Sequence, residues 1–272
     1  MKIALTGANG FVGNKLKNAF NDYIVIDRDD TVDQIINKLI NVDVVINLAG
    51  APILKKWTTK YKKVLFNSRI ETTKKLVKAI NKSKVKHFIS TSAIGIYPNN
   101  VVCDEYTLNY ENDFLSNLVE NWEKEAKKAN VLTTILRFGI VLGADGGALK
   151  QMLLPFKLGL GGIILNGQMK MSFIDIDDLI NLYHFVIKNH KDGVYNACSP
   201  HPITNYEFTK TLGKVLNRPT IFPLPKFILE LVYAEASTVL IDSKEVYPKR
   251  LENSGFTFKY PKIKNSLIHL LK

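Results

Sequence analysis

Short apolar runs alternate with amphipathic stretches along the first half of the chain. The apolar runs predict strands at residues 2–6, 23–27, 42–48, 85–91 and 131–136. Apolar positions three and four residues apart predict helices between them, at residues 11–20, 31–40, 60–81 and 114–129. Continuously apolar strands are typical of a parallel sheet that is covered on both faces. The pattern therefore predicts an α/β fold with a doubly wound parallel sheet.

The sequence pattern changes after Gly143. Seven glycines between Gly143 and Gly167 predict a loop-rich connection rather than a continuation of the sheet. Further on, the pattern predicts a strand at 193–197 and helices at 177–189, 204–218 and 226–240. We therefore expect a nucleotide-binding domain at residues 1–145 and a smaller C-terminal substrate lobe at 146–272, with residues 193–198 returning to the main sheet.

Composition is that of an ordinary globular protein, with 46% hydrophobic and 23% charged residues among 272. The two cysteines, Cys103 and Cys198, lie far apart and have no metal-ligand spacing. They argue against a disulfide framework, and because the histidines are isolated we expect no metal site. The residues before Gly7 are too few for a signal peptide, and no apolar stretch approaches the roughly 18 residues of a membrane span. We expect a cytoplasmic protein without a membrane partner.

The formal net charge of +12 would suit a nucleic-acid partner. However, the lysines are scattered along every segment, and no nucleic-acid-binding motif accompanies them. We therefore expect a small-molecule substrate and no nucleic acid, with a homodimer as the candidate assembly. A basic surface would also attract a phosphorylated cofactor or substrate.

A glycine motif lies between the first predicted strand and the first predicted helix. It consists of Gly7, Ala8, Asn9, Gly10, Phe11, Val12 and Gly13. Its three glycines allow a sharp turn, close approach of a pyrophosphate, and tight packing of the helix on the strand. The pyrophosphate then rests on the helix N-terminus, where unpaired amides and the helix dipole favour negative charge. This context predicts a Rossmann domain that binds NAD or NADP.

The choice between the two cofactors depends on the end of the second predicted strand. Asp27 lies 20 residues after Gly7 and would hydrogen-bond the adenosine ribose hydroxyls, which favours NAD. The neighbouring Arg28 could instead bind the 2′-phosphate of NADP. These two signals oppose each other, and the residues by themselves leave both cofactors open.

Small and hydroxylated residues end the next two predicted strands. Leu48, Ala49 and Gly50 suit close backbone approach beside the adenosine and ribose. Ser90 and Ser92 lie at the following strand end, at the carboxyl edge where ligands of open α/β sheets bind. We expect Ser90 to contact the cofactor and Ser92 to act in catalysis by orienting a substrate oxygen, although such hydroxyls can also cap a loop.

Together these residues resemble the extended short-chain dehydrogenase/reductases, which include nucleotide-sugar epimerases and dehydratases. The resemblance is greatest to the "epimerase family" branch, whose members are also described as cell-division inhibitors. It covers nearly the whole chain and is carried by Asn47–Ile53, Trp57, Ser68–Arg69, Ser92–Tyr97, Trp122–Glu123, Leu136–Gly143, Asp145–Gly147, Leu158–Gly162, Ile174–Asp178, Pro248–Leu251 and Gly255–Phe256. It implies an NADP-type cofactor, a C-terminal substrate lobe, and nicotinamide contacts at Gly139 and Ile140.

The chain departs from this family pattern in its catalytic pair. Typical relatives carry Tyr-x-x-x-Lys on the helix after the serine strand, where the tyrosine transfers a proton and the lysine lowers its pKa. Alignment on Glu123 places Leu115 and Val119 at these positions. Neither side chain can transfer a proton. The segment between Asp27 and Asp43 is also short, with room for a helix but for no further strand.

Five residues are candidate substrate contacts. Arg69 and Arg137 could clamp a phosphate or carboxylate, or form internal salt bridges. Trp57 could stack on a sugar or base or simply cover the cleft, and Tyr97 could act as an acid or pack in its loop. Gln168 is a candidate by position.

Two functions remain open from the sequence. We expect an NAD(P)-dependent epimerase, dehydratase or reductase-like protein acting on a small polar or nucleotide-linked substrate. The alternative is a regulatory NADP(H)-binding protein without redox activity, because the Tyr-x-x-x-Lys pair is absent.

Overall fold

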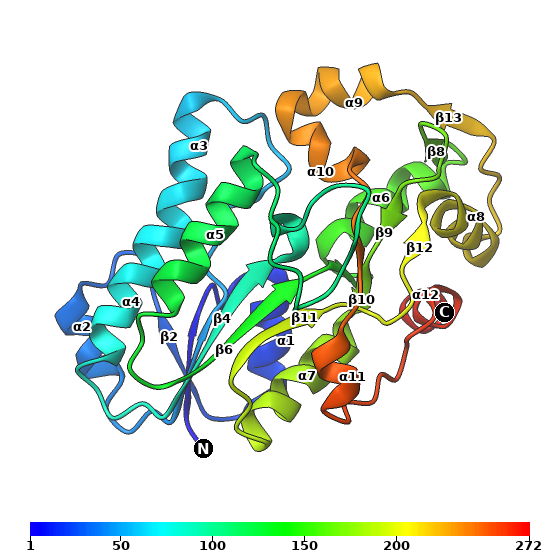
Figure 1. Cartoon of the computed structure of the whole chain (residues 1–272). Coiled ribbons are helices and arrows are strands. Elements are labelled where there is room, and N and C mark those ends of the chain that lie inside the picture. The colour runs from blue at the N-terminus through cyan, green and yellow to red at the C-terminus, as the bar shows by residue number, and fades with distance from the viewer.

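A six-stranded parallel sheet forms the centre of the molecule (Figure 1), and the computed structural model describes all residues from Met1 to Lys272. Its strand order is β11-β6-β4-β3-β1-β2. The strands are β1 (Ile3–Thr6), β2 (Tyr23–Ile26), β3 (Val44–Asn47), β4 (His87–Ala93), β6 (Leu132–Phe138) and β11 (Gly193–Ala197). Because β2 and β3 flank β1 on opposite sides, the order reverses there. The predicted doubly wound Rossmann architecture is confirmed.

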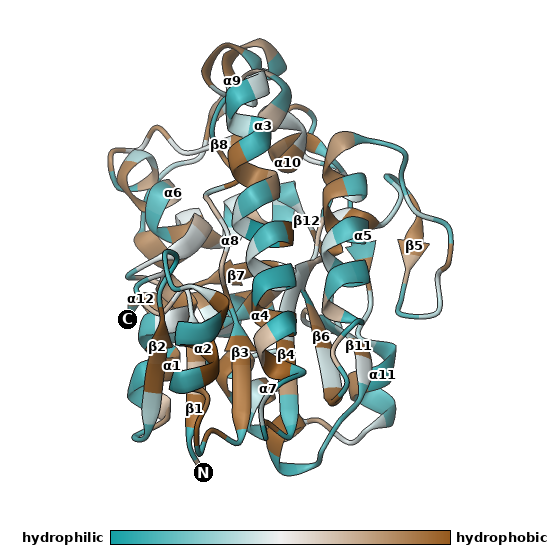
Figure 2. Cartoon of the chain, turned by 90° about the vertical axis from the view of Figure 1, so that its left-hand side faces the viewer, coloured by the Kyte–Doolittle hydropathy of each residue, from teal (hydrophilic) through white to brown (hydrophobic).

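Helices cover both faces of this sheet. One face carries α1 (Phe11–Ala19) and α7 (Ile176–Lys188). The other carries α2 (Val32–Lys38), α4 (Thr72–Ile80) and α5 (Phe114–Ala126), and α3 (Thr59–Phe66) extends this layer, with Leu65 in a cluster with Trp122 of α5. Figure 2 shows apolar strands behind helices whose outer faces are hydrophilic. All four residues of β1 are therefore buried, as a strand covered on both faces requires.

The predicted helix at residues 60–81 is a continuous helical run in three parts. A π-helical segment at Asn67–Glu71 joins α3 to α4. Between β2 and β3 the chain forms α2 and no further strand, as expected from the short segment. Thr31 begins α2 with a capping box, its hydroxyl accepting from Gln34 N while the Gln34 side chain accepts from Thr31 N.

The C-terminal half adds short strand pairs and helices. It contains β7 (Ile140–Leu142), α6 (Gly147–Lys157), β8 (Gly162–Ile164), β9 (Lys170–Met171), β10 (Phe173–Asp175), β12 (Ile203–Thr204), α8 (Asn205–Leu216), β13 (Phe222–Leu224), α9 (Lys226–Tyr233), α10 (Thr238–Ile241), β14 (Glu245–Val246), α11 (Lys249–Asn253) and α12 (Ile263–Leu271). The paired strands are β7 with β10, β8 with β13, β9 with β12, and β14 with β5 (Val102–Cys103).

Residues 143–167 stay outside the main sheet, as expected, and contain the 11-residue helix α6 between their loops. The apolar side chains of α6, including Leu149 and Phe156, pack into a core shared with α8 and α12. One expectation for this half was wrong, because the predicted helix at 226–240 is not continuous. The helix α9 ends before Ala234, which has φ +51° and begins a 3₁₀ turn (Ala234–Ser237) that precedes α10.

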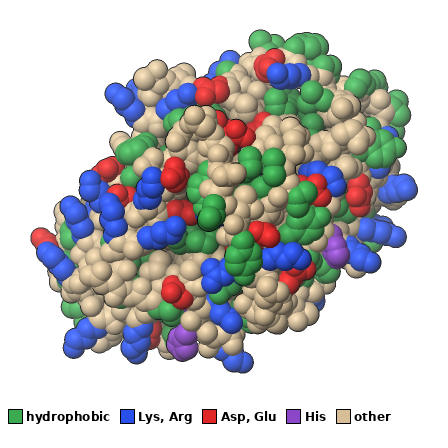
Figure 3. Space-filling model, in the orientation of Figure 1, with side chains coloured by type: hydrophobic (Ala, Val, Ile, Leu, Met, Phe, Trp, Pro, Cys, Tyr) green, Lys and Arg blue, Asp and Glu red, His purple; other side chains and the backbone are tan.

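The segment α9–α10 connects the two halves of the molecule across its upper end (Figure 1). Glu235 forms an ion pair of 2.7 Å with Lys62 of α3, and Ala236 packs in a cluster with Trp57. On the other side, Leu229 packs on the β8 region. The outer face of α9 is apolar and exposed, and hydrophobic side chains gather over it in Figure 3. None of the helices, α9 included, has the length and apolar character needed to cross a membrane.

His87, at the start of β4, has the one buried side-chain polar atom without a partner. Its Nε2 lies 2.7 Å from the Thr134 hydroxyl, whereas its Nδ1 makes no hydrogen bond. The residue is 3% exposed. Burial, with a smaller contribution from nearby His190, lowers the pKa of His87 to about 4. The folded protein therefore holds this ring neutral at neutral pH.

We expect the contribution of His87 to the free energy of unfolding to fall as the pH is lowered from about 6.5 towards 4. In that window the unfolded chain binds a proton on His87 that the folded chain does not bind. The loss can reach about 1.4 kcal/mol per pH unit. Urea unfolding should show a shallower pH dependence for His87→Gln than for the native protein, while the control His201→Gln, at an exposed histidine, keeps the native slope. Parallel profiles for His87→Gln and native protein would contradict this assignment.

Candidate functional site

The turn between β1 and α1 is held by close backbone contacts at two of its glycines. Gly7 has φ +64°, and a Cβ there would lie 2.7 Å from the carbonyl oxygen of Leu48. A Cβ at Gly13 would overlap the carbonyl oxygen of Gly7. Gly10 is different, because its Cβ would meet only the Gly7 oxygen, at 3.2 Å. The first and third glycines are therefore needed for packing, whereas the face of Gly10 is open to a ligand.

The N-terminus of α1 has unpaired hydrogen-bond donors. The backbone amides of Phe11, Val12 and Gly13 have no acceptor within the chain, and Gly10 offers no side-chain cap. Free amides and the helix dipole favour an anion at this position. The turn therefore has the donors that a pyrophosphate requires.

The side chains of this turn hold its surroundings in place. The Phe11 ring packs against the loop at Gly143–Gly147, where a Cβ at Gly143 or Gly146 would overlap it. An ion pair of 2.7 Å between Lys15 and Asp145 fixes the same loop. Ala8 is buried, and the exposed Asn9 accepts from Lys17. Phe11 can thus contribute its amide to a ligand while its ring is used in packing.

A hydrogen-bond chain joins the ends of β1 and β3. Thr6 Oγ1 donates to Asn47 Oδ1 at 2.7 Å and accepts from the amides of Leu48 and Ala49. The Asn47 side-chain amide donates to the Thr73 hydroxyl at 2.8 Å. Leu48 and Ala49 are half-buried and Gly50 is exposed, beside the glycine turn. Leu48 and Ala49 are thereby brought next to Gly7, and Gly50 follows them beside Arg69.

Arg69 is a cation without an anionic partner. Its Nη2 donates to the carbonyl oxygen of Ala51 at 3.0 Å, and its guanidinium lies against Gly50. No carboxylate lies within ion-pair distance. Partial burial lowers the pKa of Arg69 to about 10, which leaves it charged at neutral pH. A half-buried, uncompensated guanidinium at the end of β3 favours an anionic ligand there.

Cationic groups also surround the end of β2. The Asp27 carboxylate lies 3.1 Å from Lys38 Nζ, which is also 2.6 Å from Asp30. Lys75 Nζ donates to the backbone carbonyls of Arg28 and Asp30. The Arg28 side chain is exposed and unpaired. The sequence pattern did not identify Lys38 or Lys75. These lysines reach the end of β2 only because α2 and α4 pack beside it in the folded chain.

Ser92 takes part in a buried polar network. Its hydroxyl donates to Glu123 Oε1 at 2.6 Å, and the residue is 1% exposed. Glu123 accepts two hydrogen bonds from Arg137, at 2.7 Å from Nε and 2.8 Å from Nη2. Arg137 is 2% exposed. The internal salt bridge, one of the two interpretations of Arg137, is therefore the arrangement found.

The network continues from Arg137 to two tyrosines. Arg137 Nη1 donates to the Tyr97 hydroxyl at 2.7 Å, and Nη2 donates to the Tyr110 hydroxyl at 3.0 Å. Tyr97 donates to Asn196 Oδ1 of β11 at 2.9 Å. Burial raises the pKa of Tyr97 well above its ordinary value. In this arrangement the Tyr97 and Ser92 hydroxyls face the interior, and a catalytic role for Ser92 stays a prediction.

Apolar packing occupies the positions of the missing catalytic pair. Leu115 is half-buried and lies against Gly95, where a Cβ would be 2.8 Å from the leucine Cδ2. Val119 is 2% exposed and belongs to the cluster around Tyr97. Neither position therefore carries a group that can transfer a proton.

Among the remaining predicted contacts, two are buried and two lie at the start of β7 or just before it. Trp57 is 8% exposed, donates to the Ile53 carbonyl and packs on Phe114, so its ring is used in packing and has no free face. Gly139 packs closely under the Ser172 carbonyl, and half-buried Ile140 follows it in β7. Ser90 is buried.

Gln168 lies in the turn between β8 and β9 and lines a hollow of 240 Å³.

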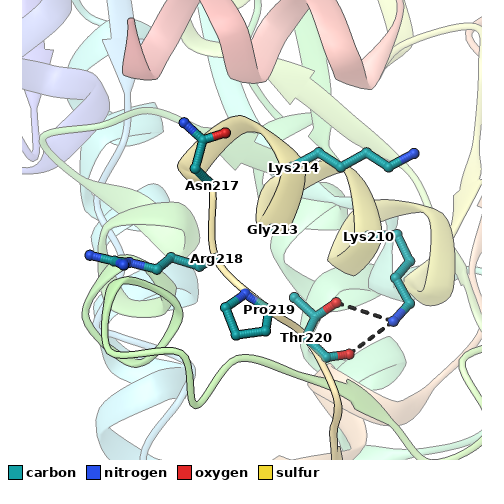
Figure 4. A pocket seen from close by; sticks show the side chains of 7 residues that line it. All are labelled: Lys210, Gly213, Lys214, Asn217, Arg218, Pro219 and Thr220. Atoms are coloured by element: carbon teal, nitrogen blue, oxygen red, sulfur yellow. Dashed lines mark hydrogen bonds between the residues drawn. The ribbon is translucent and has the colours of Figure 1, made fainter.

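Two other features carry no assignment. Asp175, Asp177 and His269 place ligand atoms within 4.8 Å of one another, but these atoms already make hydrogen bonds, including 2.8 Å from His269 Nε2 to Asp177. Figure 4 shows a hollow of 440 Å³ at the end of α8. Lys210 there donates to Thr220, while Arg218 points away from it (Figure 4). Its cations do not converge, so we assign no ligand.

Comparisons by family model and by sequence both find epimerase family proteins. The family model of the NAD dependent epimerase/dehydratase family matches residues 3–198, and a domain of unknown function, DUF1731, matches residues 224–270. Epimerase family protein SH2119 of Staphylococcus haemolyticus is 35% identical over 96% of this chain and 95% of its own length. The chloroplastic SDR39U1 homolog of Arabidopsis thaliana is also 35% identical, over 98% of this chain and 86% of its own.

Two solved structures extend the comparison. Human epimerase family protein SDR39U1, crystallised with NADPH, is 32% identical and superposes with a TM-score of 0.93 over 99% of each chain. A nucleoside-diphosphate sugar epimerase from Corynebacterium glutamicum is 26% identical, with a TM-score of 0.79 over all of this chain and 58% of its own.

We expect Glu123→Gln to lower the free energy of unfolding by about 3–5 kcal/mol, because it leaves Arg137 buried without a counter-ion. Glu120→Gln, one turn away on the same helix, is the matched control. Its exposed ion pair with Lys124 should be worth less than about 1 kcal/mol. Urea unfolding of both variants measures the difference, and equally small losses would contradict the assigned importance of the Glu123–Arg137 pair.

Proposed function

The chain belongs to the NAD dependent epimerase/dehydratase family, and from that premise we propose that it binds NADP(H) at the Gly7–Gly13 turn and acts on a small polar substrate. The observation that carries this proposal is the set of unpaired amides at the start of α1. A bound nicotinamide cofactor would supply hydride transfer, and the protein would supply binding, orientation and electrostatics.

The charge distribution supports a phosphorylated dinucleotide. The α1 amides would hold the pyrophosphate, and the unpaired Arg69 beside Gly50 would meet a further anionic group of the cofactor or substrate. Leu48 and Ala49 would lie along the adenosine side. Human SDR39U1, similar over 99% of this chain, was crystallised with NADPH, which supports the same cofactor class.

The end of β2 favours NADP over NAD. Arg28 is exposed and free to pair with a 2′-phosphate. Asp27, which opposes that phosphate, is partly neutralised by Lys38 at 3.1 Å. The added phosphate therefore meets less repulsion than the sequence by itself indicates.

Chemistry in this cleft would lack the usual proton-transfer pair. Leu115 and Val119 provide no acid or base, and positioned acid–base catalysis is worth about two to four orders of magnitude. We therefore propose an epimerase, dehydratase or reductase-like protein with slow turnover on ordinary substrates of the family. The alternative, a non-redox NADP(H)-binding regulator, rests on the same two residues. A hydride-transfer assay with nucleotide sugars, ketones and quinones separates the two, since only the first oxidises or reduces a substrate.

Gly10→Val should abolish NADPH and NADH binding while the protein stays folded. The valine would occupy the pyrophosphate position, and its Cβ would meet only the Gly7 oxygen, at 3.2 Å, so the turn needs to yield by a few tenths of an ångström. Gly13→Val is the contrasting variant and should lose stability, because its Cβ overlaps the Gly7 carbonyl. Calorimetric titration and thermal unfolding without cofactor measure both effects. Undiminished affinity in a folded Gly10→Val protein would sink the assignment of this turn.

Arg28→Ala should reduce the preference for NADPH over NADH by about tenfold or more, the value of one charge-assisted hydrogen bond. Asp27→Ala should widen the preference, because it removes a negative charge near the 2′-phosphate. The comparison uses the ratio of the two affinities in each variant, with Arg218→Ala on the α8–β13 connection as the control. If the ratio is unchanged in both variants, the end of β2 does not recognise the 2′-phosphate.

A further inference from the structure

A hollow of 240 Å³ lies where three segments from the two halves of the molecule meet. The loop after β4 contributes Asn99 and Asn100, the β8–β9 turn contributes Asn166 and Gln168, and the segment after α10 contributes Ser243. Three apolar side chains complete the lining. We call this hollow the amide pocket, because four of its side chains are carboxamides.

Hydrogen bonds tie the three segments together. The Ser243 amide donates to Asn99 Oδ1 at 2.6 Å, and the Asn100 amide donates to the Ser243 carbonyl at 3.0 Å. The Lys170 amide, from β9, donates to the Ser243 hydroxyl at 3.0 Å. The walls of the amide pocket are therefore held by backbone contacts that do not depend on a ligand.

Several polar groups of the amide pocket remain free to bind. The side chains of Asn100 and Gln168 are exposed and make no hydrogen bond within the chain. Asn166 uses its Oδ1 to accept from the Gln168 amide at 3.1 Å, which leaves its Nδ2 free. Carboxamides both donate and accept, so they match hydroxyl and amide groups of a ligand.

No charged residue lines the amide pocket. The adjoining cations are already paired, Lys170 with Glu245 at 3.4 Å and Lys244 with the Tyr97 carbonyl at 2.8 Å. Free cations lie instead at the ends of β2 and β3, as Arg28 and Arg69. A diphosphate needs such cations, and the amide pocket does not offer them.

Two segments of this pocket are connected through the chain to the cofactor edge of the sheet. Asn99 lies on the loop that leaves the carboxyl end of β4, the edge where open α/β sheets bind ligands. The β8–β9 turn leads through β9 to Ser172, whose carbonyl packs on Gly139. The volume is below the roughly 300–1,000 Å³ typical of pockets for drug-sized ligands, which limits the occupant to about one ring.

We propose that the amide pocket binds a neutral polyhydroxy or acetamido ring of the substrate, so that the substrate is a neutral small molecule rather than a nucleoside-diphosphate derivative. This rests on the proposed function, because it treats the pocket as part of the substrate cleft. The phosphate-binding groups at the ends of β2 and β3 then serve the cofactor.

Methyl NMR on the full chain tests the proposal. Met169 lines the pocket, and as one of only four methionines it can be assigned with Met169→Leu. The probes are glucose, N-acetylglucosamine and myo-inositol, with glucose 6-phosphate and UDP-N-acetylglucosamine as charged counterparts. We expect at least one neutral probe to shift the Met169 methyl signal, and each charged counterpart to bind there at least tenfold more weakly.

Variants of the pocket residues test whether the probe binds in the amide pocket. Asn100→Ala combined with Gln168→Ala should weaken the neutral probe at least tenfold, while Asn18→Ala, at an exposed amide on α1, leaves it unchanged. No response of Met169 to any neutral probe, tighter binding of the charged ones, or indifference to the double variant would overturn the proposal. Calorimetry with NADPH on the same samples reports separately on the proposed cofactor function, since these variants should bind NADPH as the native protein does.

Discussion

Close backbone packing between β1 and β3 is the constraint on which the rest of the site depends. The Gly7 turn presses on the Leu48 carbonyl, and α1 presses on the Gly7 carbonyl through Gly13. The Thr6 hydroxyl then binds the amides of Leu48 and Ala49, which keeps the two strand ends in register. Only with these contacts do the free amides of α1 stand beside the end of β3. Any side chain at Gly7 or Gly13 would separate the elements that form the proposed dinucleotide site.

The charged groups of the molecule divide into those that serve the fold and those left for ligands. Arg137 is neutralised by Glu123 and also donates to two tyrosine hydroxyls, so it stabilises the junction of α5, β6 and β4. Arg69 and Arg28 have no such partners and lie at the cofactor edge of the sheet. The same residue type thus has opposite roles, decided by whether a buried carboxylate faces it. The amide pocket, in contrast, is lined by no charged residue of either kind.

Local sequence signals predicted most of the fold and the position of the glycine turn in the candidate site. Apolar runs and helical periodicity depend on near neighbours, and the glycine spacing of residues 7–13 reports a backbone requirement directly. Contacts between elements that lie far apart in the sequence could not be predicted in this way. Nothing in the spacing of Ser92, Glu123 and Arg137 shows that they join, so Ser92 was expected to face a substrate. Glycines near Gly147 suggested loop, but they accommodate the Phe11 ring and the start of α6.

The most direct test of the central claim is a crystal structure of the full chain soaked with NADPH. The account predicts that the pyrophosphate accepts hydrogen bonds from the amides of Phe11 and Val12. It also predicts that the 2′-phosphate lies beside Arg28 and that the nicotinamide approaches Ile140. A cofactor bound elsewhere, or a pyrophosphate with no contact to the α1 amides, would contradict it.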